Sequence, residues 1–134
     1  AGADEIIDAS EGNVAEALLS LTGGDGVDVV IDFVSAASTL EAGAAALGRR
    51  GRLVTLGGAG EKFHADAHAM LLKEQDLLGS RYVTRSEVLD ALDLVARGDI
   101  WPMVTDIRPL EEAEALHERL ENGAVTGRAA LLIG

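Results

Sequence analysis

The segment that most constrains the fold is the nearly continuous apolar and β-branched run VDVVIDFV at residues 27–34. Runs of this kind are typical of a strand buried on both faces of a parallel sheet. Apolar residues recur at helical spacing on either side of it, over 13–22 and 38–47. Strand and helix therefore alternate, which favours an α/β fold with parallel strands and helices on both faces of the sheet.

The same alternation continues through the rest of the chain. Asn13 and Thr84 are each followed three residues later by a glutamate, the pattern of a capping box at a helix start. A turn is expected at 48–51, where two arginines lie between glycines. The remaining expected strands are 5–8, 52–56, 76–83, 104–107 and 127–133, and the remaining expected helices are 69–74, 84–97 and 109–121.

Composition excludes several classes of protein. The 134 residues are enough for one domain. A net charge of −12 argues against nucleic acid and anionic membranes as partners. Cysteine is absent, so disulfides and thiolate metal sites are excluded. No apolar run approaches the roughly 20 residues that span a bilayer, and no secretory signal pattern is present, so a cytoplasmic location is expected.

Six short blocks resemble one family. In chain order, they resemble the C-terminal portion of the medium-chain alcohol dehydrogenases, the zinc-dependent alcohol dehydrogenase superfamily. Their order and spacing match that family over nearly the whole chain. The blocks are GADEIID at 2–8, GVDVVID at 26–32, GRLVTLG at 51–57, LGS at 78–80, PLEEA at 109–113 and TGR at 126–128.

The resemblance implies an incomplete Rossmann-type doubly wound parallel sheet. In the family a catalytic domain comes first, followed by a strand and helix joined by a G-x-G-x-x-G fingerprint that holds the coenzyme pyrophosphate. The glycine cluster at 57–60 lacks that spacing. Residues 1–101 therefore resemble the second half of an NAD(P)-binding domain, and 102–134 resemble a tail that packs on the catalytic domain. We expect the natural protein to be longer, and the strand 27–34 to be an open sheet edge.

The resemblance also implies an activity. The family transfers a hydride between an alcohol and the nicotinamide of NAD or NADP, and this sequence leaves the choice of coenzyme open. Zinc is expected in the parent's catalytic domain and not in this chain, which supplies no catalytic residue and is expected to be inactive alone. One alternative is a zinc-free quinone or enoyl reductase of the same superfamily. Another is a non-enzymatic, flavodoxin-like binding module.

Most of the coenzyme-binding residues that the resemblance implies lie at the carboxyl ends of strands, where ligands bind in sheets of this kind. Backbone groups at the end of the strand 52–56 correspond to those that bind the nicotinamide side of the coenzyme. The end of the preceding strand lines the same cleft, together with Ser35. These residues are Phe33, Val34, Leu56, Gly57 and Gly58.

Two further parts of the chain complete this predicted site. Ser80, Arg81 and Tyr82 match the segment that holds the carboxamide and borders the substrate pocket. Arg128 matches an arginine that pairs with the coenzyme pyrophosphate, a task suited to a guanidinium. The strand 76–83 is also the expected interface of a homodimer or homotetramer, with a small alcohol or carbonyl compound as the other partner.

Other polar residues have plainer interpretations. His64 and His68 stand four apart and would share one face of a helix, but no third metal ligand has a recognisable spacing, so a solvated surface is favoured over a metal site. Asp28 and Asp32 alternate with apolar residues and are expected to project toward water.

Overall fold

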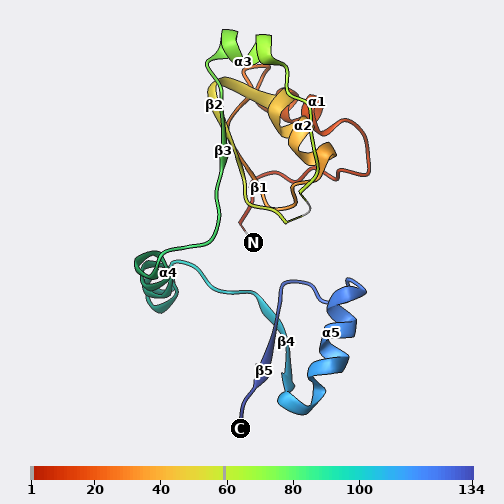
Figure 1. Cartoon of the computed structure of the whole chain (residues 1–134), viewed down its shortest axis with the longest axis vertical. Helices are drawn as coiled ribbons and strands as arrows, with labels where there is room; N and C mark the ends of the chain where they lie inside the picture. The colour runs from red at the N-terminus through yellow and green to blue at the C-terminus, as the bar shows by residue number, and fades with distance from the viewer. Residues whose placement is uncertain (1, 59) are drawn as a thin grey trace. The chain divides into compact units, whose positions relative to one another are not determined.

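The computed structural model describes residues 2–58 and 60–134 and divides into two compact units, Ala1–Tyr82 and Val83–Gly134 (Figure 1). We call them unit 1 and unit 2 and describe each by itself. Ala59, a member of the predicted glycine cluster, lies outside the described residues. The domain boundary expected between 101 and 102 stays a prediction.

Unit 1 is a three-stranded parallel sheet with the strands in the order β1-β2-β3. Helix α2 contacts both β1 and β2, and it also packs against α1 (Figure 1). This arrangement confirms the α/β class and the parallel sheet expected from the alternating pattern. The elements are α1 (Val14–Leu21), β1 (Val27–Asp32), α2 (Ala37–Ala46), β2 (Leu47–Thr55), α3 (Ala67–Lys73) and β3 (Asp76–Gly79).

The core of unit 1 lies between α2 and β2. Leu40 of α2 packs with Leu47 and Leu53 of β2, and all three are almost completely buried. Val30 of β1 and Phe63, from the segment before α3, pack against this cluster. Burying three leucines stabilises unit 1 by about 1.5–3 kcal/mol each, so this cluster is the main apolar contribution to its fold.

Strand β1 is an edge strand, as expected from the sequence. It pairs with β2 and forms one end of the sheet. The prediction that it is buried on both faces is wrong, because Val29 and Ile31 are 51% and 56% exposed. Val30, between them, faces the core. In the described residues only one face of β1 is covered, so its apolar side chains alternate between core and solvent.

Three other expected element bounds differ from the structure. Residues 5–8 form no strand, because no described strand pairs with them. Residues 48–51 belong to β2, where they form an irregularity opposite 27–29 and Arg50 takes a φ of 59°. Strand β3 ends at Gly79, well short of the expected 83.

Unit 2 contains a two-stranded parallel sheet whose crossover passes through α5. Leu116 of α5 is its buried apolar side chain, whereas α4 has no buried residue. No described helix is long and apolar enough to cross a membrane. The elements are α4 (Arg85–Arg97), β4 (Val104–Pro109), the 3-10 helix η1 (Leu110–Glu112), α5 (Ala113–Glu121) and β5 (Arg128–Leu132).

Candidate functional site

The segments that follow the three strands of unit 1 lie side by side. The backbone N–H of Leu56 donates to the carbonyl of Asp32 at 2.8 Å, and the N–H of Ser80 donates to the carbonyl of Thr55 at 3.0 Å. These bonds extend the sheet register past the ends of β2 and β3. The predicted site residues of unit 1 therefore gather along one edge, the carboxyl edge of the sheet.

The turn after β1 is organised by a carboxylate that points into the protein. Asp32 is 6% exposed, and its Oδ1 accepts hydrogen bonds from the N–H of Val34 at 2.8 Å and of Ser35 at 2.5 Å. Burial raises the pKa of Asp32, but hydrogen bonds from Thr39, Ser35 and Val34 outweigh this effect, and the pKa lies below its ordinary value. The expectation that Asp32 projects toward water is wrong, because these amides need an acceptor.

Gly57 permits a close approach between the turns that follow β1 and β2. A Cβ at Gly57 would lie 2.2 Å from the carbonyl carbon of Val34 and 2.5 Å from the N of Ser35, so a side chain does not fit. The hydroxyls of Ser35 and Thr55 are 2.5 Å apart and hydrogen-bonded. Ser35 itself has a φ of 61°, a conformation uncommon outside glycine. The two turns thus form one fixed pair.

Several predicted contact residues are open to solvent. Phe33 is 73% and Leu56 41% exposed, and a Cβ at Gly58 would meet no atom within 4 Å. Phe33 and Val34 also line a largely apolar cavity of about 590 Å³ that runs along β1 between α1 and α2. Leu56, Gly57 and Gly58 do not line it. The predicted residues of unit 1 therefore share the carboxyl edge of the sheet, but of these only Phe33 and Val34 line this cavity.

Arg81 and Tyr82 interact with each other at the end of unit 1. The Arg81 guanidinium lies 4.4 Å from the centre of the Tyr82 ring, and its Nη2 donates to the Tyr82 hydroxyl at 2.9 Å. Tyr82 is 81% exposed and has a φ of 58°. The pair presents an aromatic ring and a cation to solvent immediately after Ser80.

Arg128 belongs to unit 2, where it is the first residue of β5 and is exposed. Its backbone N–H donates to the carbonyl of Met103 at 2.7 Å. The turn before it needs Gly127, which has a φ of 87° and would place a Cβ 2.5 Å from the same carbonyl oxygen. The roles of Arg128 and of the other predicted site residues stay predictions.

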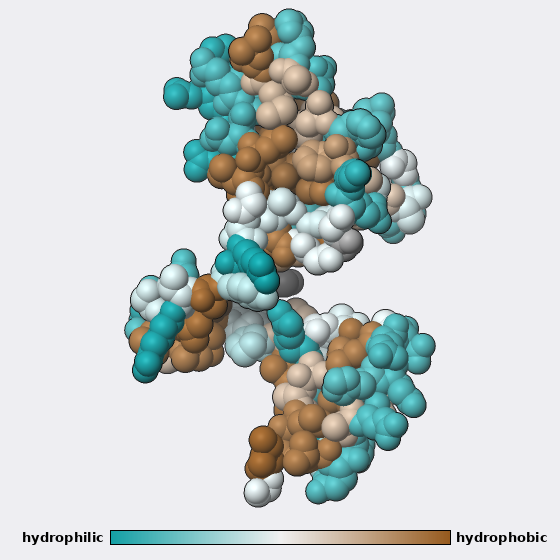
Figure 2. Space-filling model, in the orientation of Figure 1, coloured by the Kyte–Doolittle hydropathy of each residue, from teal (hydrophilic) through white to brown (hydrophobic). Residues whose placement is uncertain are grey.

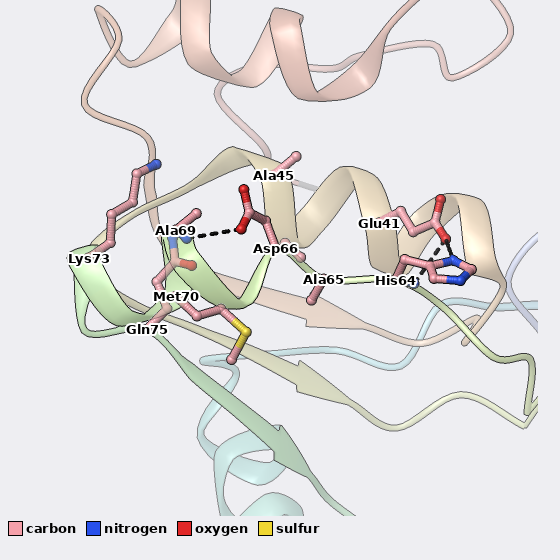
Figure 3. A pocket seen from close by; sticks show the side chains of 10 residues that line it. Glu41, Ala45, His64, Ala65, Asp66, Ala69, Met70, Lys73 and Gln75 are labelled. Atoms are coloured by element: carbon pink, nitrogen blue, oxygen red, sulfur yellow. Dashed lines mark hydrogen bonds and ion pairs between the residues drawn. The ribbon is translucent and has the colours of Figure 1, made fainter.

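The two histidines do not share a helical face. Helix α3 begins at Ala67, with Asp66 as its N-cap, so His64 precedes the helix and His68 lies in its first turn. The Nδ1 of His64 lies 3.2 Å from the Glu41 carboxylate, at one end of a cavity of about 380 Å³ (Figure 3). Within residues 2–58 and 60–134, no three histidine or acidic side chains converge on a metal position.

Comparison with known proteins identifies the family. The model of the zinc-binding dehydrogenase family matches residues 1–97 of the chain. An NAD-dependent alcohol dehydrogenase of Saccharolobus solfataricus is 34% identical over 132 residues, which are 98% of this chain and 38% of that protein. The chain therefore belongs to the zinc-binding dehydrogenase family, as the six sequence blocks indicated, and spans about two-fifths of the length of such relatives.

Solved structures agree with this assignment. An alcohol dehydrogenase from the archaeon Aeropyrum pernix superimposes with a TM-score of 0.84 at 35% identity, covering 96% of this chain and 36% of that one. A mycobacterial quinone oxidoreductase superimposes with a TM-score of 0.79 at 27% identity, covering 98% of this chain and 44% of that one. Both matches confirm the fold class predicted from the sequence.

Proposed function

We propose that this chain positions the nicotinamide coenzyme of an NAD-dependent alcohol dehydrogenase. The observation that carries the proposal is the carboxyl edge of the sheet in unit 1, where the turns after β1 and β2 pack together through Gly57. Peptide groups at such an edge are the usual ligand contacts in open α/β sheets. The Saccharolobus relative is an NAD-dependent alcohol dehydrogenase, which supports NAD over NADP.

The edge suits a coenzyme in two respects. The open space at Gly58 allows a ring to approach the backbone without meeting a side chain. The Asp32 carboxylate, which would repel a pyrophosphate, is instead directed at the amides of Val34 and Ser35. We assign ring contacts to the backbone of Leu56, Gly57 and Gly58, and pyrophosphate pairing to Arg128.

These assignments separate the role of the coenzyme from the role of the protein. When bound, the coenzyme supplies a hydride acceptor or donor at its nicotinamide ring, and the protein supplies binding and orientation. The residues of this chain hold the ring, pair with the phosphates and border the substrate through Tyr82, and Phe33 lines the coenzyme cleft. The substrate class that we propose is a small alcohol or the matching carbonyl compound.

A quinone reductase is the second candidate function. The mycobacterial quinone oxidoreductase has the same fold over 98% of this chain, at 27% identity against 35% for the Aeropyrum alcohol dehydrogenase. A coenzyme-binding edge serves either reaction, because the same nicotinamide ring accepts a hydride from an alcohol or donates one to a quinone. Turnover of a primary alcohol against turnover of a benzoquinone, each with its coenzyme, separates the two candidates.

We also propose that copies of the chain assemble into a homodimer or homotetramer through the segment 76–83. Strand β3 supports this proposal, because it lies at the opposite end of the sheet from β1 and pairs only with β2 among the described strands. Unpaired backbone groups along an edge are a template for pairing with a second copy. Sedimentation velocity of the wild type and of Gly79→Pro, which removes a backbone donor on the side of β3 that faces away from β2, tests this pairing.

Titration calorimetry with NADH and NADPH tests the coenzyme proposal on the natural protein that carries these residues. The informative variant is Gly58→Ala, because the added methyl group meets no protein atom and leaves the fold unchanged. We expect NADH to bind more tightly than NADPH, and Gly58→Ala to weaken NADH binding about tenfold without lowering the melting temperature. Glu114→Ala, on the exposed face of α5, is the control. Equal NADH affinity in wild type and Gly58→Ala would contradict the proposed contact.

A further inference from the structure

Glu61, which is not among the predicted site residues, connects the carboxyl edge of the sheet in unit 1 to helix α2. The Oε2 of Glu61 accepts a hydrogen bond from the backbone N–H of Ala37 at 2.8 Å. The backbone N–H of the same glutamate donates to the carbonyl of Ser35 at 3.2 Å. One residue thus binds both the turn after β1 and the helix that this turn leads into, across 24 residues of sequence.

Helix α2 needs this acceptor. Its N-cap residue is Ala36, which has no side-chain oxygen, and its first turn contains no acidic residue. The first amides of a helix lack partners within the helix and are satisfied by a capping side chain or by water. A carboxylate at this end is further favoured by the helix dipole. Glu61 therefore supplies from a distant loop the cap that the local sequence omits.

The same segment is anchored to α2 at two more points. Phe63 packs against the core cluster that includes Leu40 of α2. The backbone N–H of His64 donates to Glu41 at 3.0 Å, and the His64 ring lies against the same carboxylate (Figure 3). The backbone N–H and the ring of His64 hold the pKa of Glu41 below its ordinary value. Ala37 and Glu41 are one helical turn apart, so the segment 61–64 follows the helix.

Ser35 is the point where these contacts converge. Its N–H donates to Asp32, its hydroxyl bonds to Thr55, and its carbonyl accepts from Glu61. Gly57 packs directly against its peptide group. The contacts with Thr55, Gly57 and Glu61 fix the turn after β1 relative to β2 and the loop that follows it, and Glu61 also ties this turn to α2.

We propose that Glu61 is a positioning residue for the coenzyme. By capping α2 and holding Ser35, it fixes the spacing between Phe33–Val34 and Leu56–Gly58, the two sets of predicted coenzyme contacts. The inference rests on the proposed function, because it concerns the same edge. Glu61 itself is not assigned a coenzyme contact, so its effect is exerted through the backbone that it holds.

Three substitutions separate the hydrogen bond from the charge. Glu61→Ala removes both the acceptor and the charge. Glu61→Asp keeps the charge but shortens the side chain by one methylene, which withdraws the oxygen from Ala37. Glu61→Gln loses the charge but retains a carbonyl oxygen at the original reach. Lys62→Ala, which truncates the neighbouring exposed side chain, is the matched control.

The experiment measures NADH affinity by calorimetry and amide hydrogen exchange at Ala37 in each variant of the natural protein. We expect Glu61→Ala and Glu61→Asp to weaken NADH binding three- to tenfold, the size of one hydrogen bond. We expect Glu61→Gln and Lys62→Ala to bind within twofold of wild type. Exchange at Ala37 should accelerate in the first two variants only, and kcat should change less than the KM for the coenzyme.

Other outcomes overturn the inference in distinguishable ways. Faster exchange at Ala37 with unchanged NADH affinity would show a structural cap without a positioning role. Normal affinity in Glu61→Asp with weakened affinity in Glu61→Gln would assign the effect to charge. If the wild type binds neither NADH nor NADPH, the proposed function fails and this inference fails with it, whereas exchange at Ala37 still reports whether the cap exists.

Discussion

Units 1 and 2 are both built from parallel strands joined by helices, but they differ in how much apolar side chain they bury. In unit 1, Leu40, Leu47 and Leu53 are at most 2% exposed. In unit 2 only Leu116 among the large apolar residues is buried, and Leu92 of α4 is 57% exposed. Figure 2 shows apolar side chains at the surface of both units.

Helix capping, which depends on local sequence, is therefore independent of the burial of apolar side chains, which depends on tertiary packing. Both α1 and α4 have a side-chain cap, from Asn13 and Thr84, and α4 has the complete capping box. Burial instead depends on the number of strands and helices that pack together, because three strands under α2 enclose side chains that two strands and α5 leave open. Three experiments with five substitutions, taken from the largest expected effect to the smallest, test this comparison.

Truncating a core leucine should have the largest effect. Leu53→Ala removes a side chain that is 1% exposed and should lower the free energy of unfolding of unit 1 by about 2–5 kcal/mol. Leu92→Ala removes the same atoms from the exposed helix α4 and should change the free energy of unfolding of unit 2 by less than about 0.5 kcal/mol. Urea unfolding followed by circular dichroism measures both. Equal losses would show that α4 is packed as tightly as β2.

The buried carboxylate of unit 1 should produce a pH effect. Because the folded-state pKa of Asp32 is lowered, its contribution is present above the ordinary value of 3.8 and is lost as the pH falls through the folded pKa. Asp32→Asn keeps an acceptor oxygen but does not titrate. We expect wild type to be more stable than this variant by about 1 kcal/mol at neutral pH, and the gap to close in acid. A gap that is constant from pH 7 to pH 2.5 would contradict the assignment.

Removing one helix cap in each unit should have an effect no larger than that of Asp32→Asn, and the two effects should extend over different parts of the protein. Asn13→Ala removes the cap of α1, and Thr84→Ala removes the capping box of α4. Each should cost about 1 kcal/mol of helix stability. Because α1 packs on α2, the first loss should lower the unfolding midpoint of unit 1. The second should accelerate hydrogen exchange within α4 alone, and a matching shift in unit 1 would refute the separation.

Patterns within one segment predicted the fold well. Thr84 and Glu87 form the expected capping box, and Gly98 ends α4 in a left-handed conformation. The run at 27–34 contains β1, a strand of a parallel sheet, as its pattern predicted, although the strand is not buried on both faces. The pattern failed at 5–8, where an apolar pair alone does not make a strand without a partner to complete its hydrogen bonds.

Contacts between segments that are distant in the sequence could not be predicted from it. Nothing in the local sequence indicates that Asp32 turns inward to two amides, or that Glu61 caps a helix that begins 24 residues earlier. The missing side-chain cap at Ala36 is the one signal that could have prompted a search for an acceptor. The glycine pair at 57–58 was predicted from the family resemblance, but the reason for Gly57, its contact with the Val34–Ser35 peptide, is visible only in the structure.

Hydrogen exchange of the natural protein with and without NADH is the measurement that tests the central claim most directly. If the coenzyme binds at the carboxyl edge of the sheet in unit 1, NADH should protect the amides of residues 33–35 and 56–58 at least severalfold. Amides in α3, beside the cavity that contains His64, should not change. Protection of α3 with no change at 33–35 and 56–58 would contradict the account.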